Sequence, residues 1–61
     1  MKTLQVFINN KWEYVFCNNK NFNFPIITNS KKFAIRGDEK TLEEFKYSFV
    51  DFTFRISEIT L

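Results

Sequence analysis

Residues 3–17 of this chain run Thr-Leu-Gln-Val-Phe-Ile-Asn-Asn-Lys-Trp-Glu-Tyr-Val-Phe-Cys. Polar and apolar residues alternate over 3–8, and aromatic and β-branched residues dominate 12–17. Both patterns are typical of β-strands, in which successive side chains point to opposite faces. The Asn-Asn-Lys between them is typical of a hairpin turn. This stretch therefore predicts two antiparallel strands.

The length of the turn decides which side chains of the two strands share a face. A three-residue loop over 9–11 places Val6 opposite Tyr14 and puts the large apolar side chains of both strands on one face. A two-residue loop would place Glu13 opposite Val6 and mix the faces. The pattern therefore favours the three-residue loop, although Lys11 would then take the left-handed position where such loops usually carry glycine.

The segment that follows the second strand is polar and rich in asparagine, which predicts a loop over 18–25. Phe22 and Phe24 lie in it. We expect both rings to fold back onto the edge of the core, because a domain of this size needs most of its apolar side chains to be buried. The alternative is that they form a second exposed patch.

Two helices and a third strand are expected in the second half of the chain. A short helix is expected over 31–36, ended by Gly37. A longer helix is expected over 38–49, because Asp38 can cap it and apolar residues recur at helical spacing. Alternation over 51–57 predicts the third strand.

The predicted order of elements is β-β-α-α-β. A right-handed crossover through the helices places the third strand beside the first, which gives a three-stranded antiparallel sheet of order 2-1-3. The two helices then cover one face of the sheet, and residues 1–61 form a single two-layer α+β domain. Aromatic residues make up 20% of the chain. Their large buried areas can hold so small a domain together without disulfides.

The two faces of the predicted sheet differ in composition. The face expected against the helices is apolar and carries Leu4, Val6, Ile8, Trp12, Tyr14, Phe16, Phe52, Phe54 and Ile56. The open face carries Phe7, Val15, Cys17 and Arg55 among polar neighbours. Scattered apolar residues on a solvated sheet face are common, so the alternative is that they have no function. As a group, they are the candidate partner-binding residues.

The composition excludes most catalytic and metal chemistry. The chain has no histidine, one cysteine and one glycine. A Ser-His-Asp or Cys-His arrangement needs an imidazole, a zinc cluster needs several thiolates or imidazoles, and a phosphate loop needs several glycines. Arg55 could activate Cys17 only if the register brought the two side chains together. We therefore expect no enzyme, no metal and no cofactor.

The expected location is the cytoplasm, away from a membrane. No apolar run approaches the roughly 20 residues that a membrane span requires. The first residues alternate in polarity and do not resemble a signal peptide. The single cysteine fits a reducing compartment.

Two functions remain. The first is a small protein-interaction module that binds a larger protein through the open face, as an inhibitor or adaptor of the kind that phages and mobile elements encode would do. The second is single-stranded nucleic-acid binding, in which aromatic and basic residues act together. The residues for that alternative are Phe7, Lys31, Lys32, Arg36 and Arg55. Homodimerisation through an edge strand is compatible with either function.

Overall fold

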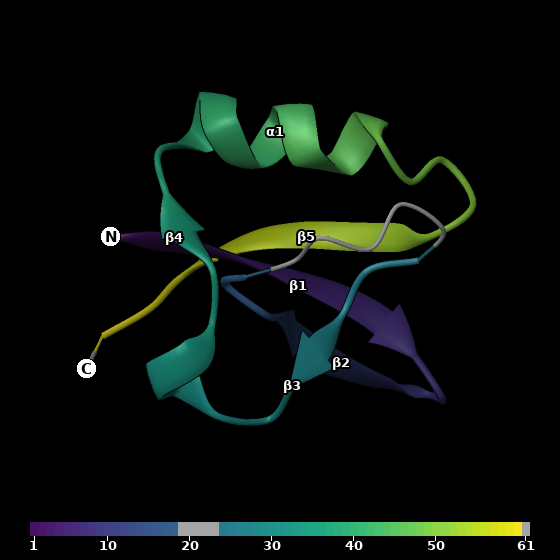
Figure 1. Ribbon diagram of the computed structural model, residues 1–61, viewed down its shortest axis with the longest axis horizontal. Coiled ribbons are helices and arrows are strands. Elements are labelled where there is room, and N and C mark those ends of the chain that lie inside the picture. Colours follow the sequence, from purple (N-terminus) through teal and green to yellow (C-terminus); the bar gives the residue numbers. More distant parts are fainter. Residues whose placement is uncertain (19–23, 61) are drawn as a thin grey trace.

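The strand β1 (Lys2–Ile8) is the centre of the fold (Figure 1). The computed structural model describes residues 1–18 and 24–60. β5 (Thr53–Glu58) pairs along one edge of β1. Two strands share the other edge: β2 (Lys11–Val15) pairs with the second half of β1, and β4 (Arg36–Gly37) pairs with its first residues. β3 (Ile27–Thr28) extends the sheet beyond β2. Every pairing is antiparallel, and the three long strands lie in the predicted order, with β1 between β2 and β5.

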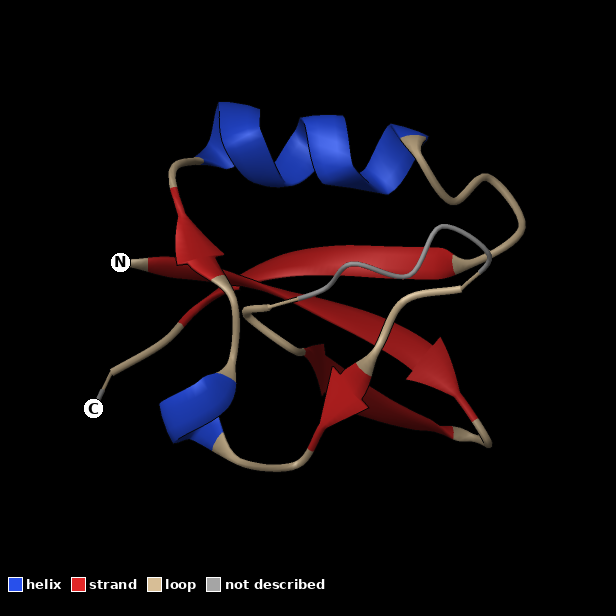
Figure 2. Ribbon diagram, viewed as in Figure 1, coloured by secondary structure: helices blue, strands red, loops and turns tan. Residues whose placement is uncertain are grey.

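One α-helix covers one face of this curled sheet, so the molecule is α+β (Figure 2). α1 (Glu39–Tyr47) lies within the predicted range 38–49. Its N-terminus is capped as expected, because the Thr41 backbone N–H donates to Asp38 Oδ1 at 2.8 Å. The prediction of three strands and two helices is wrong, since the described part of the chain has five strands and one α-helix.

The predicted helix over 31–36 is replaced by a single 3-10 turn, η1 (Lys31–Phe33), and by extended chain that leads into β4. Tertiary hydrogen bonds explain the difference. The Cys17 N–H donates to Phe33 O and the Ile35 N–H donates to Val15 O, both at 2.8 Å. These bonds tie the segment to the end of β2, so a helix cannot continue there. Gly37, expected to end that helix, is instead part of β4.

The hairpin turn has two residues, so the prediction of a three-residue loop is wrong. Asn9 and Asn10 have φ values of 55° and 64°, and Ile8 pairs with Lys11. Positive φ at both central positions defines the tight hairpin turn that suits the twist of the strands. Asparagine tolerates this conformation better than other side chains with a Cβ, whereas lysine does not. The conformational free energy of a left-handed Lys11 therefore outweighed the better separation of polar and apolar side chains that the three-residue loop would have given.

The shorter turn reverses the faces of β2. Val15 is completely buried in the core, and Glu13 lies opposite Val6. The Glu13 side chain is only 10% exposed, and its carboxylate lies 3.0 Å from the Lys11 Nζ. This ion pair offsets part of the cost of removing the carboxylate from water. Trp12 and Tyr14, expected in the core, lie on the opposite face.

The core lies between the sheet and α1. Its fully buried centre consists of Leu4, Val6, Val15 and Leu42. A group of phenylalanine rings with centroids 5.2–6.4 Å apart extends it toward the end of α1: Phe45, Phe49, Phe52 and Phe54. Of the loop aromatics, Phe22 lies outside the described residues. Phe24, expected to fold back onto the edge of the core, is 52% exposed and is not among the buried core residues.

Candidate interaction surface

The sheet face turned away from α1, called the open face below, carries a group of aromatic and polar side chains. The register defines it, because residues directly opposite each other on antiparallel strands share a face. Phe7 lies opposite Trp12, and Gln5 lies between Tyr14 on β2 and Arg55 on β5. The open face is thus built from the three long strands.

Arg55 reaches across β1 to the indole of Trp12. Its guanidinium carbon lies 4.3 Å from the centroid of the Trp12 ring, a distance typical of a cation–π contact. The Arg55 Nε–H donates to Gln5 Oε1 at 2.8 Å, and the Ser57 hydroxyl donates to the same oxygen at 3.2 Å. The partners of Arg55 within the described residues are therefore uncharged, and its positive charge remains available to a ligand.

Phe7 completes what we call the Phe7–Trp12–Arg55 cluster. Its ring meets Trp12 edge-to-face, with centroids 5.2 Å apart. Phe7 is 44% exposed, although it lies on the central strand of the sheet. The cluster therefore combines an exposed ring, a half-buried indole and an exposed guanidinium on three neighbouring strands.

The four predicted partner-binding residues do not come together. Phe7 and Arg55 share the open face as expected. Val15 is fully buried against Leu4 and Leu42, so the expectation that it is exposed there is wrong. Cys17 is exposed but lies beyond the end of β2, beside Phe33. It is five positions along the chain from Trp12, or on the order of 16 Å at the rise of a strand. Arg55 packs on Trp12 instead and cannot activate this thiol.

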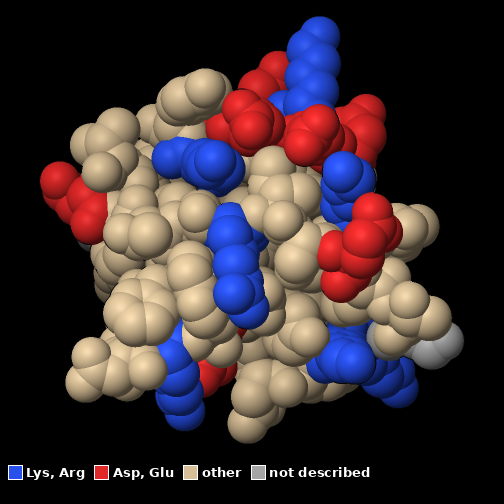
Figure 3. Space-filling view, turned by 180° about the vertical axis from the view of Figure 1, so that it is seen from behind, with Lys and Arg blue, Asp and Glu red and all other residues tan. Residues whose placement is uncertain are grey.

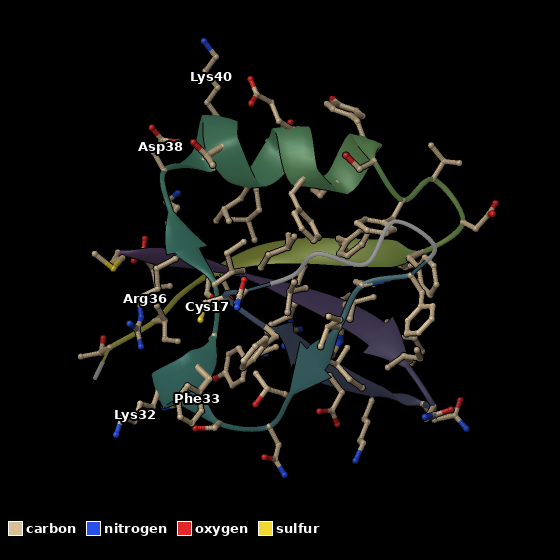
Figure 4. All side chains as sticks on the ribbon, in the orientation of Figure 1. Cys17, Lys32, Phe33, Arg36, Asp38 and Lys40 are labelled. Carbon is tan, nitrogen blue, oxygen red and sulfur yellow. The ribbon has the colours of Figure 1, made fainter. Side chains whose placement is uncertain are left out.

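Three of the predicted nucleic-acid-binding residues come together in what we call the basic corner: Lys31, Lys32 and Arg36. Figure 4 shows Lys32 and Arg36 at the same side of the molecule. The Arg36 Nη2 donates to Lys31 O at 2.8 Å and to Lys32 O at 3.4 Å, which joins β4 to η1. The Lys32 Nζ lies 5.8 Å from the ring centroid of Phe33, which is 46% exposed. The basic corner adjoins Cys17 and is separate from the Phe7–Trp12–Arg55 cluster.

Charge is distributed unevenly over the molecule. Five of the seven acidic residues belong to α1, its cap or the loop that follows: Asp38, Glu39, Glu43, Glu44 and Asp51. In the view from behind, acidic side chains gather mainly over α1, whereas basic side chains are spread over the whole face (Figure 3). Glu13, which the predicted three-residue loop would have placed on the open face, lies on the core face with Lys11. The open face is therefore mildly basic.

Sequence analysis missed Trp12 and Tyr14 as members of the open face. The signal was present in Asn9-Asn10, because this pair suits a two-residue turn and the adjoining Lys11 does not suit the left-handed position of a longer one. The hydrophobic pattern favours the longer loop, whereas the residues of the turn favour the shorter one. Reading the turn first would have moved both aromatic residues to the correct face.

Other chemistry is sparse in residues 1–18 and 24–60. No group of three or more histidine, cysteine or acidic side chains there could hold a metal ion. No helix of that part is long and apolar enough to cross a membrane. Comparison with models of protein families, with curated proteins and with solved structures found no match.

Proposed function

We propose that this protein is a small non-enzymatic interaction module, which binds a larger protein through the Phe7–Trp12–Arg55 cluster on its open face. The observation that carries the proposal is the stacking of Arg55 on Trp12 beside the exposed ring of Phe7. Binding without chemistry is how an inhibitor or an adaptor acts, and a cytoplasmic setting suits the free thiol of Cys17.

The composition of the cluster supports a protein partner. Tryptophan, tyrosine and arginine are the residues most often found as energetic hot spots in protein interfaces. Gln5 holds the Arg55 guanidinium in place at 2.8 Å, so less side-chain entropy is lost when a partner binds. A carboxylate or a carbonyl group of the partner would complete the hydrogen bonding of Arg55, and apolar groups would cover Phe7.

The test compares two double variants as bait in lysate of the native host. Phe7→Asp with Arg55→Glu alters the cluster, and Tyr47→Asp with Lys40→Glu makes matched changes on the outer side of α1, where Tyr47 is 73% exposed. Circular dichroism first confirms that both variants fold. We expect one protein to be retained by the natural chain and by the α1 variant, and to be lost with the cluster variant.

Nuclease treatment of a parallel sample separates this function from the second candidate. A protein captured through the cluster stays bound after the treatment. Equal capture by both double variants would mean that the open face does not bind the partner, and would contradict the proposal.

Single-stranded nucleic acid is the second candidate, favoured by a specific arrangement. Trp12 and Tyr14 join Phe7 on the open face while Glu13 leaves it, which gives aromatic rings for base stacking without a carboxylate among them. The basic corner of Lys31, Lys32 and Arg36 supplies charges for phosphate contacts. This candidate ranks second because the cluster itself contains a single cation.

Fluorescence anisotropy with labelled single-stranded oligonucleotides of mixed sequence tests this candidate. Each phosphate contact releases counterions, so affinity should fall steeply as salt rises. Lys31→Glu with Lys32→Glu should weaken binding and flatten its dependence on salt. Binding that is absent at low salt, or that does not depend on salt, would exclude nucleic acid.

A further inference from the structure

Within the described residues, the outer edge of β5 offers backbone groups that no other strand pairs with. The Ile59 N–H donates to Met1 O at 3.0 Å, which makes residues 59 and 1 a hydrogen-bonded pair. Such pairs alternate along an antiparallel ladder, so the backbone groups of Thr53, Arg55 and Ser57 also face β1. Those of Phe54, Ile56 and Glu58 therefore point outward. Within residues 1–18 and 24–60, no strand pairs with this outer edge.

The usual devices that protect an edge strand are missing from β5. Natural sheets protect their edges with proline, with bulges, with very short strands or with charged side chains that extend over the edge. β5 has six residues, contains no proline, and pairs with β1 without interruption. Arg55, the cation in its middle, leans inward to Trp12 and leaves the edge uncovered. The Glu58 carboxylate lies 3.5 Å from the amino group of Met1.

We propose that β5 pairs with β5 of a second copy of this chain, antiparallel and centred on Ile56. In this register Ile56 lies opposite the second copy's Ile56, and Phe54 lies opposite its Glu58. All three outward-facing residues of each strand are then paired. This gives three hydrogen-bonded residue pairs across the two-fold axis (the dyad) that relates the two copies. Arg55 lies beside the second copy's Ser57.

Competing registers are poorer. Centring the pair on Arg55 would oppose two guanidinium groups directly, which destabilises a strand pair, and would leave only two hydrogen-bonded residue pairs. Centring it on Ser57 also leaves two. A shift by one residue would join an inward-facing position to an outward-facing one, and the backbone groups would not meet.

Side-chain burial also favours the second copy as the occupant of this edge. Phe54 and Ile56 lie on the core face, pack against the core and are only half-buried. The dyad brings the two Ile56 side chains together on that face and covers part of this apolar surface. Both copies of α1 then lie on one side of an extended sheet, and both Phe7–Trp12–Arg55 clusters lie on the other. The pairing is independent of the proposed function.

Analytical ultracentrifugation of the full chain is the first test, run from about 10 µM to about 1 mM because self-association depends on concentration. We expect a reversible shift from the mass of one chain to that of two. Phe7→Asp should leave this shift unchanged, since Phe7 is on the open face. A monomer at every concentration would overturn the proposal, as would a dimer that Phe7→Asp abolishes.

Disulfide trapping tests the register. Arg55→Cys and Ser57→Cys are made separately in a Cys17→Ser background, and the two proteins are oxidised alone and mixed. Opposite residues of a non-hydrogen-bonded pair have Cα atoms about 4.5 Å apart, within the reach of a disulfide. We expect cross-linking to be at least several-fold faster in the mixture than in either protein alone. Faster cross-linking of Arg55→Cys alone would place the dyad at Arg55 and overturn the register.

Discussion

The guanidinium carbon of Arg55 lies 4.3 Å from the ring centroid of Trp12, although Arg55 is on β5, Trp12 is on β2, and β1 lies between them. The contact spans the sheet because Gln5, on β1, accepts a hydrogen bond from the Arg55 Nε–H at 2.8 Å. A residue of the central strand thus holds a side chain of one neighbour over a ring of the other. This contact links side chains of all three long strands on the open face.

The contact between Arg55 and Trp12 should contribute measurably to stability. A double-mutant cycle with Arg55→Ala and Trp12→Ala, measured by urea denaturation, should give a coupling of about 0.5–1 kcal/mol. The same cycle at Lys32 and Phe33, where the cation lies 5.8 Å from the ring and both side chains are exposed, should give less. A coupling of zero at the first pair would show that the stacking is not stabilising.

Truncation of a core residue should cost more than truncation of Trp12, even though tryptophan is larger. Leu42 is fully buried between α1 and the sheet, so Leu42→Ala should cost about 2–5 kcal/mol. Trp12 is half-buried on the open face, and Trp12→Ala should cost less. Thermal denaturation of the two variants checks the order. A larger loss of stability with Trp12→Ala would indicate that the indole is buried in the core.

Two substitutions of Asn10 in the hairpin turn should change the stability of the protein in opposite directions. Asn10 has a φ of 64°, which glycine adopts without strain. Asn10→Gly should therefore raise the unfolding midpoint, whereas Asn10→Ala should lower stability by about 1 kcal/mol. Chemical denaturation of both variants measures the difference. Equal stabilities would be incompatible with a left-handed residue at this position.

Gly37, the single glycine, should tolerate replacement. A Cβ at this position would meet the Thr41 side chain at 3.7 Å, an ordinary contact, and φ is not in the left-handed region. Gly37→Ala should leave the fold intact and stabilise it by about 0.4–1 kcal/mol, because alanine restricts the unfolded chain. The melting temperature checks this. A marked loss of stability would show that β4 needs the freedom of glycine.

The cap of α1 should make stability fall in acid. Hydrogen bonds from Thr41 to the Asp38 carboxylate lower the pKa of Asp38 below its ordinary value of 3.8. This contribution is present above pH 3.8 and is lost as the pH falls through the lower pKa of the folded state. Asp38→Asn should remove this part of the acid dependence, as measured by urea denaturation between neutral pH and pH 2. An unchanged acid profile would contradict the role of Asp38.

Sequence reasoning succeeded where a pattern is local. The alternation over 3–8 and the capping residue Asp38 located β1 and α1 correctly, because pleat and helix geometry act on neighbouring residues. It failed over 31–36, where hydrogen bonds to Val15 and Cys17 hold the chain extended. No pattern within that segment reveals partners so distant in the sequence.

The candidate site was half predicted for the same reason. Phe7 and Arg55 were correctly assigned to the open face, since each strand's own alternation fixes its two faces. Val15 was not, because the choice between the faces of β2 depends on the turn before it. A turn longer by one residue would place Trp12 on the core face and Glu13 on the open face.

The sequence by itself determined the element types of the long segments and the absence of histidine chemistry, since both follow from residue types and local periodicity. It also predicted the order of the three long strands, through the general preference for right-handed crossovers. Only the tertiary structure decided the faces of β2, the extended path of the chain from η1 into β4, and the stacking of Arg55 on Trp12. Each of these depends on strand register. Register is a relation between segments distant in the chain, and free energies from turns, burial and pairing together determine it.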